Sequence, residues 1–175
     1  MINKPTPTPS LKGGELNMMH EVYLGLGSNL GDRHALMEKA ITVIGERIGK
    51  VVRQSSFIET EPWGFESDNR FLNAVVLVAT ELTPREVLAQ TQQIEKDLGK
   101  TKEHATERSP RYSLSTSLST LPSPRYKDRP IDIDILLYDD VMIDEPDLKV
   151  PHPHMHERDF VMKPLEEVRG KGAKE

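Results

Sequence analysis

The chain has 175 residues and a formal net charge of −5 at pH 7, and it contains no cysteine. This length predicts one domain with a sizeable core. The absence of cysteine excludes disulfides and thiolate chemistry and favours a reducing cytoplasm. No apolar run is long enough to span a membrane, and the acidic balance argues against a nucleic-acid binder. Residues 96–129 nevertheless carry eight Lys or Arg against four Asp or Glu, which suits a small polyanion such as a nucleotide.

The sequence divides into a tail, one domain and a second short tail. Residues 1–19 lack a signal-peptide pattern and are predicted to be a flexible tail, residues 20–169 form a single domain, and residues 170–175 are a charged tail. Apolar patterns predict strands over 21–27, 51–58, 71–79 and 131–138, with helices beginning near residues 31 and 83. The strand over 71–79 is apolar on both faces and is expected at the centre of the sheet. Residues 100–128 are predicted to be a long mobile loop with an insertion.

Three glycines lie where the first strand meets the first helix. Gly25, Gly27 and Gly31 give the pattern G-x-G-x-x-x-G, one residue longer than the dinucleotide-binding fingerprint, and no Lys follows as a phosphate-binding loop requires. We interpret these glycines as a tight turn, with direct phosphate contact as the less favoured alternative.

Two aspartates share one face of the strand over 131–138. Ile131, Ile133, Ile135 and Leu137 alternate with Asp132, Asp134, Leu136 and Tyr138, so one face is predicted to be buried and the two carboxylates to lie about 6.6 Å apart along the other. A solvated strand face is one interpretation. The other is a magnesium site, because Mg²⁺ binds a few carboxylates together with water and phosphate oxygens, and the nearby Arg129 suits phosphate.

Other polar positions admit both structural and functional interpretations. Phe71 and Asn73 share a strand face, as a core pair or as a ring-stacking surface beside an amide. Gln92 and Glu95 are neighbours on a helix flank, which is usually solvated. His152, His154 and His156 alternate and could hold zinc if extended, but the following residues favour a helical turn from about His154 that would separate the imidazoles.

Five motifs together resemble a known enzyme family. They are residues 27–33 (GSNLGDR), 60–62 (TEP), 71–73 (FLN), 128–136 (DRPIDIDIL) and 150–160 (VPHPHMHERDF). In this order they are similar to 6-hydroxymethyl-7,8-dihydropterin pyrophosphokinase of folate biosynthesis, over about residues 20–168. The resemblance implies an α+β fold, an α/β sandwich with a ferredoxin-like core whose mainly antiparallel sheet is flanked by helices. It also implies transfer of pyrophosphate from ATP to the dihydropterin, giving AMP.

The resemblance also implies a set of site residues. Asp132 and Asp134 would hold two Mg²⁺ ions and act in catalysis with Arg129, a phosphate-binding residue. The ATP site would comprise Gln92, Glu95, Lys100, Arg129, Ile135, Lys149, His152 and Arg158. The pterin pocket would comprise Thr60, Glu61, Trp63, Phe71, Asn73, Tyr126 and Phe160, with Phe71 and Phe160 on the two sides of the ring.

The chain departs from the family pattern in three places. Lys100 stands where several relatives have Arg, which should weaken bidentate phosphate contact. The loop over 100–128 has an insertion of about twenty residues, and the carboxyl end is shorter than in many relatives. These departures leave open a second class of function, a nucleotide- or pterin-binding protein without catalysis, and the histidines leave open a metal-binding module. We expect a cytoplasmic monomer with small-molecule substrates and no nucleic-acid or membrane partner.

Overall fold

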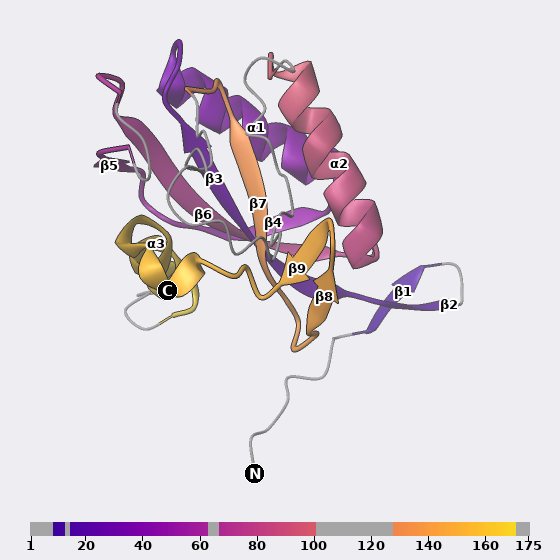
Figure 1. Ribbon diagram of the computed structural model, residues 1–175. Coiled ribbons are helices and arrows are strands. Elements are labelled where there is room, and N and C mark those ends of the chain that lie inside the picture. The colour runs from indigo at the N-terminus through magenta and orange to yellow at the C-terminus, as the bar shows by residue number, and fades with distance from the viewer. Residues whose placement is uncertain (1–8, 13–14, 63–66, 101–127, 171–175) are drawn as a thin grey trace.

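The computed structural model describes residues 9–12, 15–62, 67–100 and 128–170, and its main feature is an antiparallel sheet flanked by helices (Figure 1). The sheet has the order β4-β6-β3-β7, with β5 paired to β6 as well. Its strands are β3 (His20–Ser28), β4 (Lys50–Gln54), β5 (Ile58–Thr60), β6 (Phe71–Thr80) and β7 (Asp132–Tyr138). All of its pairs are antiparallel. Since β6 separates β3 from β4 and β7 lies on the other side of β3, this is the ferredoxin-like arrangement that the family resemblance implies.

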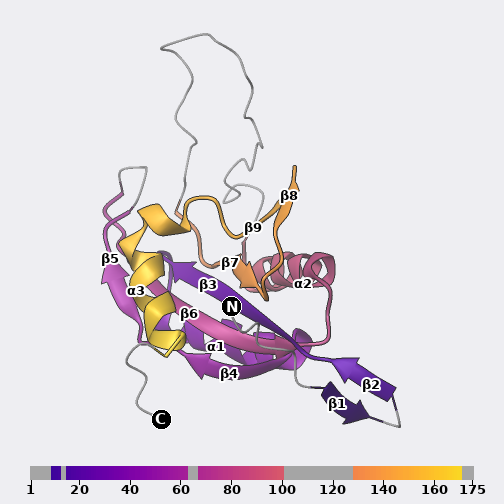
Figure 2. The ribbon, with the colours of Figure 1, turned by 90° about the horizontal axis from the view of Figure 1, so that it is seen from below.

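Helices cover both faces of the sheet. Helices α1 (Arg33–Arg47) and α2 (Pro84–Asp97) pack on one face, and α3 (Asp159–Val168) packs on the other, as Figure 2 shows from below. Buried side chains accordingly form two clusters. One joins the sheet to α1 and α2 through residues such as Met37, Ile44 and Ile94, and the other joins β6 and β7 to α3 through Val75 and Leu165. The predicted central strand β6 is buried along nearly its whole length.

Local chemistry accounts for the helix starts. The Thr83 hydroxyl accepts a hydrogen bond from the backbone N–H of Glu86, and the Glu86 carboxylate accepts one from the backbone N–H of Thr83. This is the predicted capping box, with Pro84 at the first helical position. Asp32 caps α1 by accepting a hydrogen bond from the backbone N–H of Ala35. Gly31 precedes it with a φ of +69°, a conformation that glycine adopts without strain.

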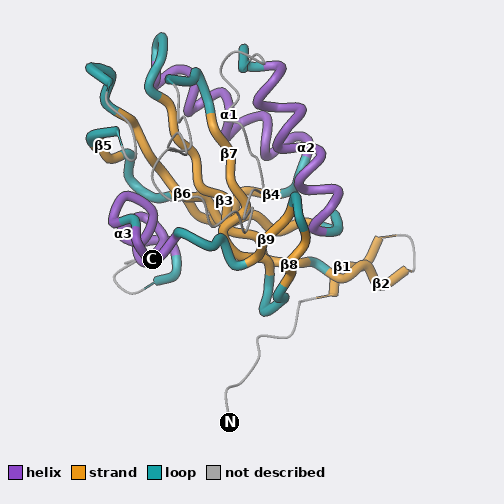
Figure 3. The backbone as a smooth tube through the Cα atoms, in the orientation of Figure 1, coloured by secondary structure: helices purple, strands orange, loops and turns teal. Residues whose placement is uncertain are grey.

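Two hairpins and a short helix complete the described chain (Figure 3). β1 (Pro9–Lys12) pairs with β2 (Glu15–Met18) inside the stretch that the sequence predicts to be a flexible tail. β8 (Ile143–Glu145) pairs with β9 (Leu148–Val150), and a 3-10 helix η1 follows at Met155–Glu157. The predicted loop over 100–128 lies almost wholly outside the described residues. Among the helices described, none is long and apolar enough to cross a membrane.

Strand β7 departs from the predicted alternation at its end. Its register with β3 shifts between Tyr23 and Leu24, so that Leu136 is an extra residue on β7, as in a β-bulge. After the shift, Tyr138 lies in the cluster under α2 and its hydroxyl donates to the Leu82 carbonyl at 2.6 Å, while Leu137 lies on the α3 side. The predicted faces of Leu137 and Tyr138 are therefore wrong. Asp132 and Asp134 precede the bulge and keep the predicted face.

The interpretation of the first glycines as a turn is also wrong. Gly25 and Gly27 lie inside β3, and only Gly31 lies in the turn that follows. A Cβ built on Gly27 would lie 3.1 Å from Asn73 Oδ1 on the neighbouring strand, and one on Gly25 would lie 3.3 Å from the Leu136 side chain. Glycine is therefore used here for close approach of side chains over the strand.

Candidate active site

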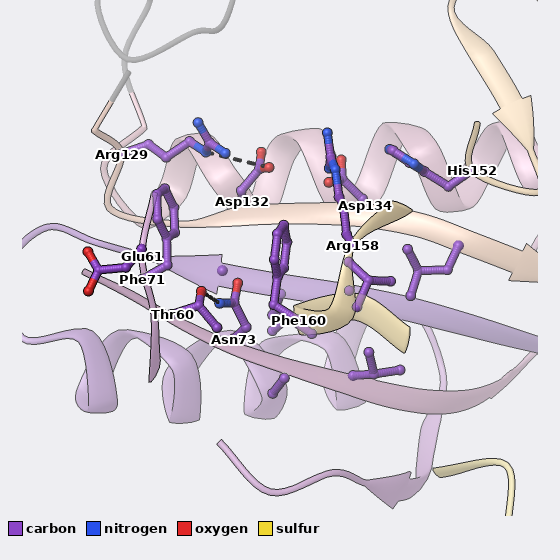
Figure 4. A pocket seen from close by; sticks show the side chains of 17 residues that line it. Thr60, Glu61, Phe71, Asn73, Arg129, Asp132, Asp134, His152, Arg158 and Phe160 are labelled. Carbon is purple, nitrogen blue, oxygen red and sulfur yellow. Dashed lines mark hydrogen bonds and ion pairs between the residues drawn. The ribbon is translucent and has the colours of Figure 1, made fainter. Parts of the chain in front are cut away.

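A pocket opens on the face of the sheet beside α3 (Figure 4). Strands β3, β6 and β7 provide its floor, the end of β5 borders it, and the segment from His152 to α3 forms the other side. It is lined by Gly25, Leu26, Gly27, Thr60, Glu61, Phe71, Asn73, Ala74, Val75, Arg129, Asp132, Asp134, Leu136, His152, Arg158, Phe160 and Val161. Ten residues that the sequence predicts for the ATP, metal or pterin sites are among them, so the fold brings together positions up to a hundred residues apart.

Two aromatic rings and two arginines stand around the pocket. Figure 4 shows the rings of Phe71 and Phe160 standing on either side of a gap. The guanidinium carbon of Arg129 lies 5.0 Å from the centre of the Phe71 ring, and that of Arg158 lies 5.8 Å from the Phe160 ring. Both distances are within cation–π range. Each aromatic ring thus lies next to a positively charged guanidinium group. This arrangement suits a ligand that has a planar ring and an anionic substituent.

An amide lies at the base of the gap between the rings. Asn73, on β6, is only 6% exposed and its Nδ2 donates to the Thr60 hydroxyl at 2.7 Å. This bond orients the side chain, so that Asn73 Oδ1 lies over Gly27. Glu61 is held at the rim by Arg70, whose Nε lies 3.1 Å from Glu61 Oε1. We call the gap between the rings of Phe71 and Phe160 the aromatic slot. A hydroxyl, an amide and a carboxylate at one end of this slot can form hydrogen bonds with the edge of a heterocycle.

The two aspartates of β7 form the acidic part of the pocket. Lys100 Nζ lies 2.7 Å from Asp132 Oδ1 and also pairs with Glu95, while Arg129 Nε lies 3.5 Å from Asp132 Oδ2. Burial would lower the pKa of the Lys100 ammonium, but Asp132 and Glu95 outweigh it and the pKa is raised. Glu95 is only 4% exposed, so the interpretation of a solvated helix flank is wrong for this residue. Its charge is balanced by Lys100.

The histidine segment is divided between the pocket and the surface. His152 lines the pocket, and burial lowers its pKa despite the opposing effect of Asp134. His152 Nδ1 accepts a hydrogen bond from the backbone N–H of His154 at 3.3 Å, so the neutral ring carries its proton on Nε2. His154 pairs with Glu157, and His156 is exposed on η1, the helical turn predicted from about His154. No group of three or more His, Cys, Asp or Glu placed to hold a metal occurs in the part of the chain that is described.

Other predicted site residues lie outside the pocket. Gln92 is exposed on α2, Lys149 is half-buried on β9 and pairs with Asp144, and the Ile135 side chain lies in the core under α2. Glu95 and Lys100 adjoin the pocket through Asp132. In Figure 1, α2 and β9 flank β7, the strand that carries the aspartates and Ile135. Trp63 and Tyr126 lie outside the described residues.

Sequence reasoning missed the small residues of the floor. Gly25 and Gly27 are two apart on β3 and therefore share the face that Asn73 and Leu136 reach from the neighbouring strands. The period of the first strand carried this signal, because Val22, Leu24 and Leu26 are buried on its opposite face. Because the glycines were interpreted as a tight turn, their common face on the strand was not recognised.

Replacing Gly27 with alanine is expected to raise the KM for the ring-bearing substrate by about tenfold. The new methyl would lie 3.1 Å from Asn73 Oδ1 and displace the amide at the base of the pocket, at a cost typical of one disturbed hydrogen bond, about 1 kcal/mol or more. Gly45→Ala on α1 is the matched control, because the neighbour that a Cβ there would meet is Val51 Cγ2 on β4, at an ordinary contact distance of 3.9 Å. Steady-state kinetics of both variants test this; an unchanged KM in Gly27→Ala would show that Asn73 does not contact the substrate.

The fold and the pocket define an α+β protein whose antiparallel sheet carries two aspartates, and whose pocket suits a planar ligand together with phosphate groups. Comparison with known proteins gives the family. Residues 23–170 match the model of the 7,8-dihydro-6-hydroxymethylpterin-pyrophosphokinase (HPPK) family. The chain belongs to this family. The predicted family, its reaction in folate biosynthesis, the diphosphotransferase class and ATP as co-substrate are thereby confirmed.

Relatives of known sequence agree with this family assignment. Proteins named 2-amino-4-hydroxy-6-hydroxymethyldihydropteridine pyrophosphokinase include one from Porphyromonas gingivalis, 46% identical over 148 residues, which cover 84% of this chain and 89% of that protein. Another, from Bacillus subtilis, is 38% identical over 152 residues, covering 86% of this chain and 79% of that protein.

Solved structures support the fold. The wild-type HPPK-DHPS of Plasmodium falciparum, solved with pteroate, matches with a TM-score of 0.63 at 15% identity, covering 87% of this chain and 41% of that one. This chain therefore spans about two fifths of that longer protein. The likeness confirms the predicted fold class.

Proposed function

We propose that the pocket beside α3 is where this chain transfers the pyrophosphoryl group of ATP to 6-hydroxymethyl-7,8-dihydropterin. The observation that carries this proposal is the close association of an aromatic slot with a carboxylate pair and two arginines in one pocket. The slot suits a flat bicyclic ring, and the charged residues suit a triphosphate with its metal ions. Family membership fixes the reaction, and the residues that line the pocket support the residue roles proposed below.

The pterin ring would lie between Phe71 and Phe160. Aromatic stacking on two sides stabilises a planar heterocycle by about 1–3 kcal/mol for each stacked base in comparable sites. Asn73 and Thr60 are positioned at the base to hydrogen-bond the ring edge, with Glu61 at the rim. Trp63 and Tyr126 are proposed as further pterin contacts on the resemblance alone.

The donor set of β7 fits Mg²⁺. Asp132 and Asp134 supply two carboxylates on one face of a strand, and Mg²⁺ ordinarily completes its shell with water and substrate phosphates rather than with further side chains. We propose two ions, as the resemblance implies. When bound, they would neutralise negative charge on the phosphate oxygens and orient the triphosphate of ATP for transfer. Lys100 and Arg129, which now face Asp132, would then be available to the phosphates.

ATP would lie along β7 between α2 and β9. Gln92 and Glu95 on α2, Lys149 on β9 and Ile135 in β7 flank this path, and the Ile135 side chain is buried, so its contact would come from the backbone. His152, protonated on Nε2, can donate to a phosphate oxygen without carrying a charge. Arg158, beside Phe160, lies where the two substrates would meet.

Transfer requires positioning and charge neutralisation more than covalent catalysis. The hydroxymethyl oxygen of the pterin would attack the β-phosphorus of ATP, the bond from that phosphorus to the oxygen of AMP would break, and the hydroxyl proton would leave to solvent. Arg129 and Arg158 would stabilise charge spread over the transferring phosphates. The walls of the slot would hold the attacking oxygen in line.

The direct test is AMP formation from ATP and Mg²⁺ with and without the dihydropterin. We expect AMP only when both substrates are present. Calorimetry with a non-hydrolysable ATP analogue separates the alternative class, because a binding protein without catalysis would bind the analogue with Mg²⁺ yet form no AMP. That result, or a lack of binding, would overturn the proposal.

We also propose that the enzyme works as a cytoplasmic monomer. The support for the compartment is the cysteine-free composition, which suits a reducing environment. Sedimentation at assay concentration would test the oligomeric state, and a stable dimer would contradict it.

A further inference from the structure

Asp128, a part-buried carboxylate outside the pocket, joins three segments that are far apart in the chain. Its Oδ1 accepts hydrogen bonds from Asn29 Nδ2 at 2.6 Å and from the Ser67 hydroxyl at 2.7 Å, and its Oδ2 accepts one from Asn69 Nδ2 at 2.8 Å. The backbone N–H of Asn69 also donates to the Ser67 hydroxyl at 3.1 Å. We call Asn29, Ser67, Asn69 and Asp128 the Asp128 clasp. All four lie outside the residues that line the pocket.

The clasp fixes the backbone of Arg129. The N–H of Arg129 donates to Asn29 Oδ1 at 2.7 Å, and the N–H of Asn29 donates to the Arg129 carbonyl at 3.2 Å. Asn29 is only 3% exposed, so its side chain cannot turn without breaking these bonds inside the protein. Because Asp128 accepts from the amide of the same Asn29, it sets the orientation of the group that holds Arg129.

The Arg129 side chain connects this anchor to the pocket. It reaches from the fixed backbone over the Phe71 ring at 5.0 Å and places Nε 3.5 Å from Asp132 Oδ2. A long side chain has many rotamers, and a fixed backbone with a ring beneath it selects few of them. A shift of the anchor would therefore move the guanidinium relative to both the aromatic slot and the carboxylates.

The clasp carries a negative charge at neutral pH. Burial alone would raise the pKa of Asp128, but the hydrogen bonds from Ser67, Asn69 and Asn29 outweigh it, and the pKa lies below its usual value. Three neutral donors converge on a charged acceptor, and such charge-assisted bonds are stronger than those between neutral groups.

We propose that Asp128 is a positioning residue for pyrophosphoryl transfer. It acts through Asn29 to hold Arg129 between the aromatic slot and the carboxylates of β7. The proposal rests on the proposed function, in which Arg129 contacts the transferring phosphates. Asp128 itself touches neither substrate. Its effect on the reaction is therefore expected to disappear when Arg129 is absent.

A double-mutant cycle tests this coupling. Asp128→Ala is expected to lower kcat about 10- to 100-fold, the range that follows from a misplacement of about 1 Å. In an Arg129→Ala background, the same change is expected to lower kcat by less than about threefold, because the group it positions is gone. A merely structural Asp128 would instead lower kcat by the same factor in both backgrounds.

Two further variants keep the test interpretable. Asp68→Ala removes a carboxylate from an exposed neighbour of the clasp and is expected to leave kcat unchanged. Asp128→Asn keeps the size of the side chain but replaces one acceptor oxygen by an NH₂ that faces one or two of the three donors. It replaces Asp128→Ala in the cycle if the alanine variant does not fold. If neither Asp128 variant folds, the clasp serves stability and the proposal is overturned.

The outcomes separate this inference from the function on which it rests. Full activity in Arg129→Ala would refute the proposed role of Arg129 and, with it, the clasp. A loss in Arg129→Ala together with equal activities in Asp128→Ala and Asp68→Ala would overturn the clasp alone. A lack of AMP formation by the unaltered protein would overturn the proposed function before the cycle is begun.

Discussion

Replacing Asp134 with asparagine is expected to lower the rate of AMP formation by about 10³-fold or more while leaving the fold intact. The change keeps the shape of the side chain and removes the charge that a divalent ion requires. Charge stabilisation by a metal supplies several kcal/mol to such transfers, and about 4 kcal/mol corresponds to 10³ in rate. Asp134 precedes the bulge of β7 and is only half-buried, so the strand should tolerate the amide.

Asp132→Asn is expected to be as inactive, with an added effect on stability. Asp132 accepts from Lys100, which also balances the buried Glu95, so the variant disturbs a charge network as well as the metal site. Asp140→Asn is the matched control, because this exposed aspartate lies just beyond the same strand. Rates of AMP formation measured across a Mg²⁺ titration, with thermal melting as the check on folding, test the assignment of the two aspartates to the metal site. Activity within tenfold of the unaltered enzyme in Asp134→Asn would refute the metal assignment.

Removing either wall of the aromatic slot is expected to raise the KM for the pterin by about 10- to 100-fold. Phe71→Ala and Phe160→Ala each delete one stacking face, which is worth about 1–3 kcal/mol. The affinity for an ATP analogue should change little, because the nucleotide would lie along β7. Both phenylalanines also carry an arginine over their rings, so some loss in kcat is expected as well.

Phe57→Leu provides the aromatic control for these variants. Phe57 is half-buried against the cluster that joins the sheet to α1 and α2, on the face opposite the pocket. It does not line the pocket. Pterin binding by calorimetry should be weakened by the two slot variants and not by this one. Equal weakening in all three would show a general loss of packing, and no weakening in the slot variants would place the pterin elsewhere.

The part of the fold that could be predicted is the part encoded by local pattern. The double-sided apolar run of β6 indicated a central strand, and the capping box at Thr83 indicated where α2 begins. The alternation before Leu136 likewise placed Asp132 and Asp134 on one face. Each of these signals depends on neighbours within a few residues, where sequence and geometry are directly linked.

The parts that failed depend on contacts between distant segments. The bulge at Leu136 comes from how β7 pairs with β3, more than a hundred residues away, and alternation alone does not encode it. Glu95 was expected to be solvated because local sequence does not show that Lys100 pairs with both Glu95 and Asp132, which lies on the distant strand β7. The Asp128 clasp likewise joins three segments, and no short motif predicts it. For the site, family resemblance supplied the residues that local patterns did not.

A single-turnover experiment tests the central claim most directly. The unaltered 175-residue protein, in excess over limiting ATP, is mixed with Mg²⁺ and 6-hydroxymethyl-7,8-dihydropterin, and the phosphorus-containing products are resolved by ³¹P NMR. One AMP and one pterin diphosphate for each ATP consumed is the result that the pocket and the family predict. ADP with a pterin monophosphate, or ATP left unconsumed, would contradict it.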